Sequence, residues 1–382
     1  MSFENLKGQD SAVSYLKASL RNGRVSHAYI FSGPVGVGKH LAAVNFAKAL
    51  NCSSSVSGSG SHPELVDGSA KLTIDPEQSR RVEGCDRCSS CKKIDSLSHP
   101  DIFTLKPKEE GGSIKTLRPF GRLKAVLSNV EGRQAQGLYP ERGRGIKIED
   151  VRALIKDVYL KPFEARKKVY MIEGAEHMKH EAANALLKTL EEPPADSVII
   201  LLTENIKALF HTIVSRCQVV KFFPLKLQEV EDILIKEHSL SKSDAHTLSH
   251  LSGGRLGEAL KFKEEDIFTK RSLLINKILS PFKADFDFDD LPKEDVRIYL
   301  DMMLAWYSDI LNMKAGAGDH MLINIDKKDI ISKESGRLGF DHIEDMIKSV
   351  ISAMTQIEQN ANQKLAMSVL GMKIKQVSVC TK

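Results

Sequence analysis

The stretch SHAYIFSGPVGVGKHLAAVNFAKAL, residues 26–50, decides the fold of the first part of this chain. It opens with an apolar, β-rich segment and passes through a glycine-rich turn. It closes with LAAVNFAKAL, which has the apolar face of a helix. A strand, a glycine-rich loop and a helix in this order are the context in which a phosphate-binding loop is found. The sequence therefore predicts an anion-binding turn between a buried strand and a helix.

The loop itself, GPVGVGKH at 33–40, follows the pattern G-x-x-x-x-G-K-[ST] except at its last residue. Gly33, Gly38 and Lys39 fit the pattern and Gly36 adds a third glycine, but His40 stands where a hydroxyl belongs. In a complete loop, backbone amides and the helix N-terminus hold phosphates, and the hydroxyl ligates Mg²⁺. We expect the bulkier imidazole to disrupt metal placement while leaving anion binding open. The alternative is a glycine-rich turn that holds no ligand.

A second acidic site is expected where KVYMIEGAEHM, residues 168–178, leaves its strand. Enzymes that hydrolyse nucleotides on this architecture end that strand in Asp-Glu, and the second carboxylate polarises the attacking water. Here the pair is Glu173 and Gly174, so the position of the general base has no carboxylate. Glu176 lies two residues further on, and we do not expect it to substitute. Two independent defects both point to lost hydrolysis.

The rest of the chain reads as an α/β domain followed by helices. Further strands are expected at DIFTL (101–105), KVYMI (168–172), SVIILLT (197–203) and VVKFF (219–223), with a helix at 179–192 that Pro193 and Pro194 stop. Apolar strands alternating with helices predict a parallel sheet covered on both faces. Beyond residue 225 every period is helical. We therefore divide the chain into an α/β domain at 1–223, a small helical domain at 224–266 and an all-α C-terminal domain at 267–382.

Composition sets the class of protein. The 382 residues are 42% hydrophobic and 27% charged, with a formal net charge of +5, which is typical of an ordinary globular chain whose mildly basic surface permits nucleic-acid contact without demanding it. The opening MSFENLKGQD lacks the apolar core of a secretory signal, and the longest apolar run is VIILL at 198–202. We expect a cytoplasmic protein with no membrane contact.

Two stretches of the first domain read as insertions. Residues 53–70 are rich in Ser and Gly. The second insertion spans about 106–147. From Gly111 to Lys147 it carries eight basic residues against Glu131 and Glu141: Lys115, Arg118, Arg122, Lys124, Arg133, Arg142, Arg144 and Lys147. A solvated surface loop and a contact with a phosphate backbone are both compatible with this composition.

Cysteines suggest a metal site. Cys85, Cys88 and Cys91 have the spacing C-x2-C-x2-C, and Cys52 lies at the end of the helix after the glycine-rich loop. Four thiolates can close a tetrahedral Zn²⁺ site, whose saturated coordination gives it a structural role. An iron–sulfur cluster or unligated thiols are the alternatives. We expect a zinc module at about 52–91.

An arginine lies just before the last strand, in TIVSRCQVV at 212–220. The guanidinium of Arg216 stays charged and offers a fork of donors, which suits a phosphoryl transition state even when it is supplied from outside the active site. The alternative is an arginine at a strand edge that pairs with a local carboxylate.

Taken in order, these motifs resemble the clamp-loader subunits of the AAA+ class. The resemblance rests on GQDSAVSYLKASLRNGRVSHAYIFSGPVGVGK, CDRCSSC, HPDIF, VYMIEGAEHM, ANALLKTLEEPP and SRC, which run from Gly8 to about Cys217. GGRLGEAL at 253–260 extends it into the second domain, while the C-terminal domain carries no motif. Motor subunits of that family have a complete loop and an Asp-Glu strand end. The degenerate versions in this chain resemble the delta-prime class of the bacterial DNA polymerase III clamp loader.

That resemblance implies a RecA-like AAA+ domain, a helical lid and a helical collar that joins five subunits, including gamma/tau-like motors and a delta-like subunit, into a ring. It implies a four-cysteine zinc module at this place. It assigns Arg216 as an arginine finger that reaches ATP on a neighbouring motor, Thr203 as a first sensor and Arg255 as a second. A sensor arginine departs from the pattern of an inert subunit, so it keeps ATP or ADP binding open.

Three functions follow from these expectations. The leading one is a non-hydrolysing scaffold subunit of the polymerase III holoenzyme that helps load a sliding clamp onto primer–template DNA. The second is an active AAA+ ATPase of the gamma/tau type that works with Glu173 alone and senses nucleotide with Arg255. The third is a zinc-stabilised DNA-binding module that uses the basic insertion.

Overall fold

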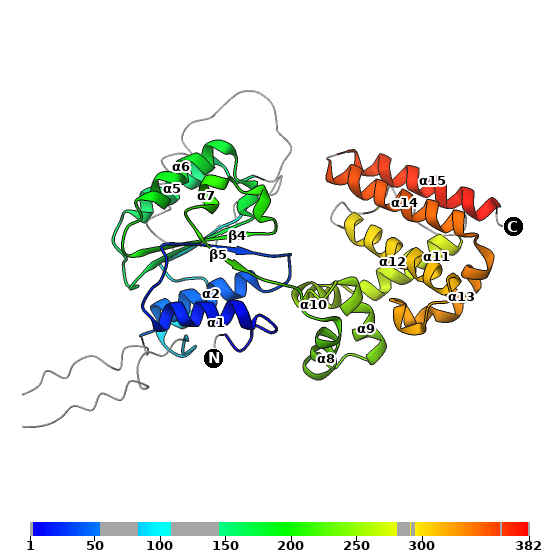
Figure 1. Ribbon diagram of the computed structural model, residues 1–382, viewed down its shortest axis with the longest axis horizontal. Coiled ribbons are helices and arrows are strands. Elements are labelled where there is room, and N and C mark those ends of the chain that lie inside the picture. Colours follow the sequence, from blue (N-terminus) through cyan, green and yellow to red (C-terminus); the bar gives the residue numbers. More distant parts are fainter. Residues whose placement is uncertain are drawn as a thin grey trace, which may run out of the picture. The chain divides into compact units, whose positions relative to one another are not determined.

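The computed structural model describes residues 3–53, 83–107, 145–280, 291, 295–359 and 361–380. These residues divide after Phe223 into two units, and each is described by itself (Figure 1). Most of the Ser/Gly-rich stretch, at 54–70, and the larger part of the basic insertion, at 108–144, lie outside the described residues.

The first unit is built on a parallel sheet with the strand order β2–β3–β4–β1–β5. The strands are β1 Ala28–Ser32, β2 Ile102–Leu105, β3 Lys168–Glu173, β4 Ser197–Thr203 and β5 Gln218–Lys221. The predicted α/β class and the parallel sheet are confirmed, with each predicted strand within a few residues of its observed position. Because β1 lies between β4 and β5, the loop that follows it opens at the carboxyl edge of the sheet, inside the edge strand β5, and open α/β sheets bind their ligands at this edge.

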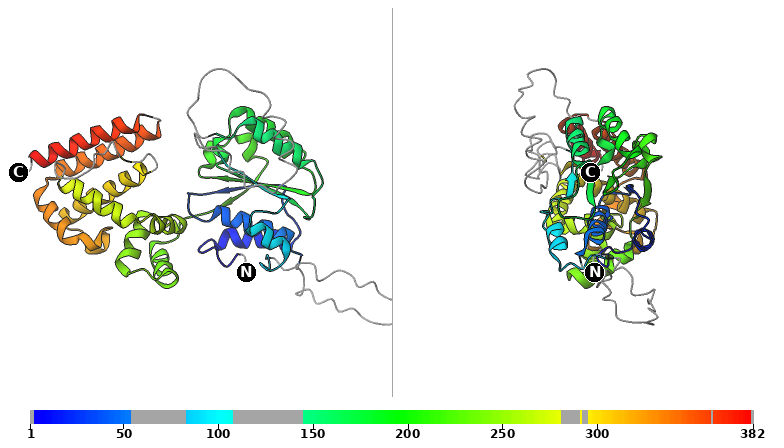
Figure 2. Two further views of the ribbon diagram at one scale, coloured as in Figure 1. Left: turned by 180° about the vertical axis from the view of Figure 1, so that it is seen from behind. Right: turned by 90° about the vertical axis from the view of Figure 1, so that its left-hand side faces the viewer.

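Helices cover both faces of this sheet. Side chains alternate along each strand, so Tyr29 and Phe31 pack with α1 and α2 on one face, while Ala28 and Ile30 pack with α5 and α6 on the other. Figures 1 and 2 show the two helical layers. The helices of this unit are α1 Asp10–Arg21, α2 Lys39–Asn51, α3 Ser89–Asp95, α5 Ile148–Val158, α6 His180–Glu191 and α7 His211–Val214, with short 3₁₀ turns at Ala175–His177 (η2) and Ile206–Ala208 (η3).

The second unit is helical throughout its described residues. Its helices are α8 Leu227–His238, α9 Lys242–Leu251, α10 Leu256–Glu264, α11 Ile267–Leu279, α12 Val296–Lys314, α13 Lys328–Arg337, α14 Phe340–Glu358 and α15 Gln363–Cys380, with 3₁₀ turns at Asp319–Met321 (η5) and Ile325–Lys327 (η6). One hydrophobic cluster runs from Leu225 to Ile374 and includes the buried Trp306. The helices on both sides of residue 266 therefore share a core.

A buried polar network also crosses residue 266. Arg271 on α11 forms two hydrogen bonds with the carboxylate of Asp326, of 3.0 and 2.7 Å, and a third with Asn324. Buried Asp309 on α12 accepts the backbone amides of Ile323 and Asn324, each at 2.8 Å. Such a network is costly to leave half-satisfied, so it fixes the segment between α12 and α13 against α11.

Candidate functional site

The glycine-rich loop has the backbone of a phosphate-binding turn. Gly33 follows β1 directly and donates its amide to the carbonyl of Thr203 at 3.2 Å. A Cβ atom at residue 33 would lie 2.3 Å from the carbonyl oxygen of Phe222, so only glycine fits there. Gly36 and Gly38 have left-handed backbones, with φ of 81° and 94°, and Gly38 caps the N-terminus of α2. The loop glycines thus serve the fold of the turn itself.

Lys39 is turned back onto its own loop. Its Nζ donates hydrogen bonds to the carbonyl oxygens of Gly33 and of Pro34, the latter at 2.7 Å. Burial lowers the pKa of Lys39, although nearby carboxylates, that of Glu204 first, act to raise it. The ammonium group is therefore held by loop carbonyls at the place from which it would reach a phosphate.

His40 contacts the acidic residue at the end of β3. Its Nδ1 atom lies 2.7 Å from Oε1 of Glu173, and Nζ of Lys106 lies 3.1 Å from Oε2 of the same carboxylate. Burial acts to raise the pKa of Glu173, but the contact with His40 and the charge of Lys106 outweigh it and hold the pKa below its usual value. The Glu173 carboxylate is thus paired with His40 and Lys106. The sequence analysis did not predict Lys106 as a partner.

Gly174 occupies the position where a general base would stand. Its φ of 58° and ψ of 45° are left-handed, a conformation that costs other residues roughly 1–2 kcal/mol. A Cβ atom there would lie 2.8 Å from Cγ of Pro107. Glu176, the nearest downstream carboxylate, accepts the backbone amide of Glu204 at 3.0 Å. The left-handed backbone at residue 174 therefore favours glycine. Because glycine has no side chain, this position also lacks a carboxylate.

The two sensor candidates lie in different units. Thr203 is buried at the end of β4, beside the loop, and its hydroxyl accepts the amide of Asn205 at 3.2 Å. Arg255 lies in the second unit, where it precedes α10. Its Nε donates to the carbonyl of Ser252 at 2.5 Å, and one of its Nη atoms lies 3.9 Å from the Glu258 carboxylate. The structure brings Thr203 together with the loop, and Arg255 belongs to the second unit, which is described by itself.

Arg216 lies between α7 and β5 and is held by a local carboxylate. One Nη atom lies 2.6 Å from Oε1 of Glu191, the last residue of α6. The other donates to the carbonyl of Thr212 at 3.0 Å and to the hydroxyl of Ser215 at 3.3 Å. The side chains of Arg216 and Glu191 are 36% and 50% exposed. The local pairing that the sequence left as an alternative is thus present, at a surface open to solvent.

The four predicted metal ligands come together. The sulfur atoms of Cys52, Cys85, Cys88 and Cys91 all lie within 4.8 Å of one another. Zn–S bonds of about 2.3 Å in a tetrahedron place sulfur atoms about 3.8 Å apart. The backbone amides of Cys88 and Cys91 donate to the Sγ atoms of Cys85 and Cys88, at 3.3 and 3.4 Å. Such N–H donors suit thiolates, so these residues fit a four-thiolate metal site.

The C-terminal end of α2 anchors this cluster to the sheet. Nζ of Lys48, a buried residue of α2, lies 2.9 Å from Asp86, within the cysteine turn, and 2.5 Å from Asp95 at the end of α3. Asn51 accepts the backbone amides of Arg166 and Lys167, at 3.1 and 3.0 Å, just before β3. The sequence analysis did not single out Lys48 and Asn51. The only signal for either residue was a polar side chain on the apolar face of a helix.

Among the described residues, no helix combines the length and the apolar content that crossing a bilayer requires.

Comparison with known proteins fits this arrangement. The sequence model of the family described as DNA polymerase III, delta subunit, matches residues 8–66 and 63–226, and that of its C-terminal part matches residues 286–373. The DNA polymerase III subunit delta' of Bacillus subtilis is 28% identical over 365 residues, which cover 93% of this chain and 92% of that protein.

More distant relatives belong to the same group of subunits. The DNA polymerase III subunit tau of Bacillus subtilis is 27% identical over 73% of this chain, a match that spans only 41% of its own length. A DNA polymerase III gamma subunit-related protein of Thermotoga maritima aligns over 95% of this chain and 99% of its own, at 15% identity and a TM-score of 0.42. The match of the family model over more than half of the chain shows that this protein belongs to the DNA polymerase III delta-subunit family, and within it the chain resembles the delta' subunit of Bacillus subtilis.

Proposed function

We propose that this chain is a non-hydrolysing, delta-prime-like scaffold subunit of a clamp loader. In this proposal it joins gamma/tau-like motors and a delta-like subunit in a pentameric ring. It supplies Arg216 in trans to ATP on a neighbouring motor while the ring loads a sliding clamp onto primed DNA. The observation that carries the proposal is the contact between His40 and Glu173, because it replaces the pairing of a hydroxyl and a carboxylate through Mg²⁺.

Three features support the loss of hydrolysis. The imidazole of His40 stands in place of the metal-ligating hydroxyl. The carboxylate of Glu173 already lies against His40 and Lys106, and Gly174 supplies no base. The glycines and Lys39 remain, so the loop keeps the part of the motif that holds an anion. Binding of ATP or ADP without turnover is consistent with this geometry.

Arg216 is the group that we assign to catalysis in trans. It is half-exposed on the first unit, and its guanidinium is held by one carboxylate and two neutral oxygens. A guanidinium that reaches the phosphates of an adjacent subunit stabilises the charge that builds up during phosphoryl transfer. In family members supplied with such a residue, the active nucleotide lies on the neighbour.

The four-cysteine cluster is assigned a structural Zn²⁺. Its ligands are Cys52, Cys85, Cys88 and Cys91, which leave no open coordination position. The metal would supply folding free energy and no catalytic chemistry. Its place at the end of α2, with Lys48 and Asn51 beside it, supports a role in fixing that helix.

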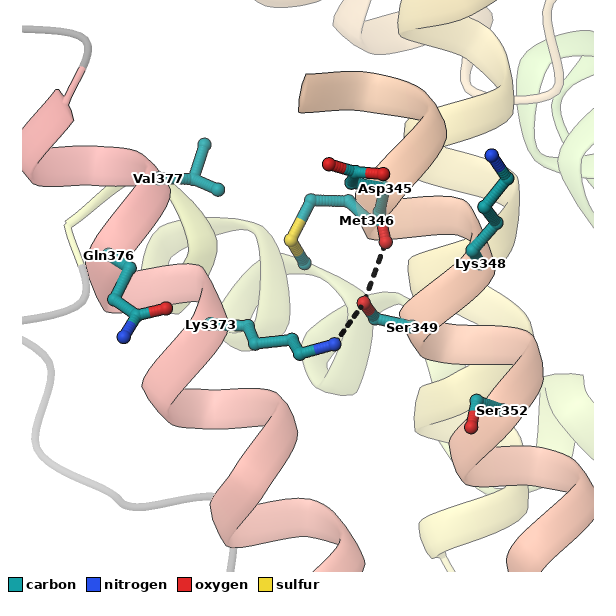
Figure 3. A pocket seen from close by; sticks show the side chains of 8 residues that line it. All are labelled: Asp345, Met346, Lys348, Ser349, Ser352, Lys373, Gln376 and Val377. Carbon is teal, nitrogen blue, oxygen red and sulfur yellow. Dashed lines mark hydrogen bonds between the residues drawn. The ribbon is translucent and has the colours of Figure 1, made fainter. Parts of the chain in front are cut away.

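The C-terminal helices are assigned to ring assembly, with a lid at 224–266 and a collar at 267–382. α15 packs one stripe into the core and exposes a second, apolar one: Leu365, Val369 and Met372 are 64%, 47% and 63% exposed. Beside this exposed stripe, a groove of about 500 Å³ lies between α14 and α15 (Figure 3). There Lys373 donates to Ser349 at 3.0 Å. Apolar side chains at helical spacing beside a polar rim suit helix-to-helix contact between subunits.

Two measurements test this function. The purified chain alone should show no ATP turnover above background; robust turnover that Lys39→Ala abolishes would establish an active ATPase instead. In a loader reconstituted with motor and delta-like subunits, Arg216→Ala should lower the ATPase rate by 10-fold or more at the site it serves, because removing an arginine finger costs on the order of 10³-fold. Assembly of the complex, measured by size-exclusion chromatography, should be unchanged.

A further inference from the structure

The partner of Arg216 within this chain occupies the donors that a phosphate would use. Glu191 accepts from one Nη atom at 2.6 Å, and Thr212 and Ser215 accept from the other at 3.0 and 3.3 Å. Of these acceptors only Glu191 carries a charge. The carboxylate also stands at the C-terminal end of α6, where the helix dipole adds partial negative charge that favours a cation. In this arrangement the negative charge of Glu191 therefore offsets the positive charge of the Arg216 guanidinium.

This pairing is weak enough to exchange. Both side chains are more than one third exposed, and exposed ion pairs shift an equilibrium by only about 1.4- to 5-fold. A phosphate group carries more negative charge than a carboxylate and accepts a guanidinium through two parallel hydrogen bonds. The contacts with Thr212 and Ser215 involve neutral oxygens, so they can persist while Glu191 is replaced.

We infer that Glu191 is the resting-state partner of Arg216, which it restrains in the unassembled chain and surrenders to the terminal phosphate of a nucleotide on the adjacent subunit. This inference rests on the proposed function. Glu191 is a positioning residue, since it acts only through Arg216. In this exchange a phosphate group replaces the Glu191 carboxylate as the partner of the same guanidinium, and no proton is transferred. Its consequence is that the finger presents its full positive charge only when a phosphate arrives.

The isolated full-length chain provides the first test. An arginine-selective dicarbonyl reagent, phenylglyoxal, modifies guanidinium groups that are not engaged, and peptide mass spectrometry reports the rate at Arg216. Glu191→Gln should raise that rate by about 1.4- to 5-fold, and added salt should raise the rate of the wild type but not of the variant. Glu192→Gln, which neutralises the adjacent carboxylate, is the matched control and should leave the rate unchanged. Equal rates in all three chains would overturn the inference.

The reconstituted loader provides the second test. Glu191→Gln should raise kcat/KM for ATP by about 1.4- to 5-fold, and this gain should vanish in an Arg216→Ala background. A decrease with Glu191→Gln, or a change that persists without Arg216, would overturn the inference. Arg216→Ala alone separates the two proposals: if it has no effect, the finger assignment fails, whereas a large effect of Arg216→Ala with none of Glu191→Gln removes only the role of Glu191. Thermal unfolding of Glu191→Gln and Glu192→Gln should match, which excludes a general loss of stability.

Discussion

Helix α2 begins at the glycine-rich loop and ends at the cysteine cluster. These two motifs differ in how many of their functional residues they keep. At the N-terminal end, Lys39 and His40 are held by loop carbonyls and by Glu173. At the C-terminal end, Cys52 joins three other cysteines in a cluster that keeps every ligand. One helix of 13 residues, about 20 Å long, thus connects a degenerate site to a complete one.

The difference shows how each kind of site depends on its parts. Nucleotide hydrolysis needs a hydroxyl, a metal and a base at once, so in the proposed function two changed residues suffice to remove the reaction while the backbone of the loop stays in place. A structural metal site needs all of its ligands for folding. We therefore expect perturbations at the cysteine end to affect stability far more than perturbations at the loop end.

The largest effect should follow from breaking the cysteine cluster. Cys88→Ser, or removal of metal with a chelator, should strongly destabilise the first unit, because binding free energies at structural zinc sites reach about 10 kcal/mol. Metal analysis should find one zinc per wild-type chain and less in the variant. Cys217→Ser, which lies outside the cluster, is the control and should retain the metal. A metal-free chain that melts at the wild-type temperature would contradict a structural role.

A smaller effect should come from Gly174, beside the loop. Gly174→Ala should lower the free energy of unfolding by about 1–2 kcal/mol through its left-handed backbone, and by more if Pro107, 2.8 Å from the new Cβ atom, cannot move. Gly253→Ala is a matched control, because Gly253 has the same φ of 58° with nothing within 4 Å of a Cβ atom. Denaturant unfolding of both variants separates the cost of backbone strain from that of the contact. Equal losses would mean that Pro107 relaxes freely.

The pairing of His40 with Glu173 should give a modest dependence of stability on pH. The pKa of Glu173 is lower in the folded chain than its ordinary value of 4.5. Its contribution is therefore present above pH 4.5 and is lost as the pH falls through the lowered folded pKa. His40→Ala should reduce this acid-sensitive component by no more than about 1 kcal/mol, because the pair is partly exposed. His211→Ala, at an exposed histidine on α7, should leave the pH profile intact.

The smallest change concerns Cys217, a thiol that lies outside the cluster. Burial raises the pKa of Cys217 to about 12, so at pH 8 almost none of it is thiolate, the form that reacts. In the native chain without chelator, iodoacetamide should leave Cys217 largely unmodified, whereas chelation should expose Cys52, Cys85, Cys88 and Cys91 to labelling, as read by mass spectrometry. Rapid labelling of Cys217 in the native chain would show that its burial is transient.

Local patterns predicted most of the fold. The strand at 197–203 was placed to the residue, because a continuous run of β-branched and apolar side chains is typical of a strand buried on both faces. The helix predicted at 179–192 was observed at His180–Glu191, where Pro193 and Pro194 prevent its continuation. The strand order was not predicted, because it depends on contacts between segments far apart in the chain.

The sequence predicted which residues belong to the site, but it predicted less well which side chains contact one another. Cys52 stands 33 positions before Cys85, so the residues alone gave only a moderate signal for grouping it with the other three cysteines, and the resemblance to a known family strengthened that grouping. The pairs His40 with Glu173 and Arg216 with Glu191 join separate elements, so spacing along the chain carried no signal for them. The left-handed backbone of Gly174 was likewise hidden, because a glycine in a sequence marks permissive conformation without saying which one is used.

That backbone has a consequence for any attempt to build a complete hydrolytic site beside this loop. His40 occupies an ordinary helical position at the start of α2, so a threonine could replace it without remodelling the chain. Residue 174 differs, because a glutamate introduced there would inherit the dihedral angles of 58° and 45° and would direct its carboxylate from the wrong backbone. The two defects are unequal barriers to restoration: one is a side-chain exchange, and the other is a change in the path of the main chain after β3.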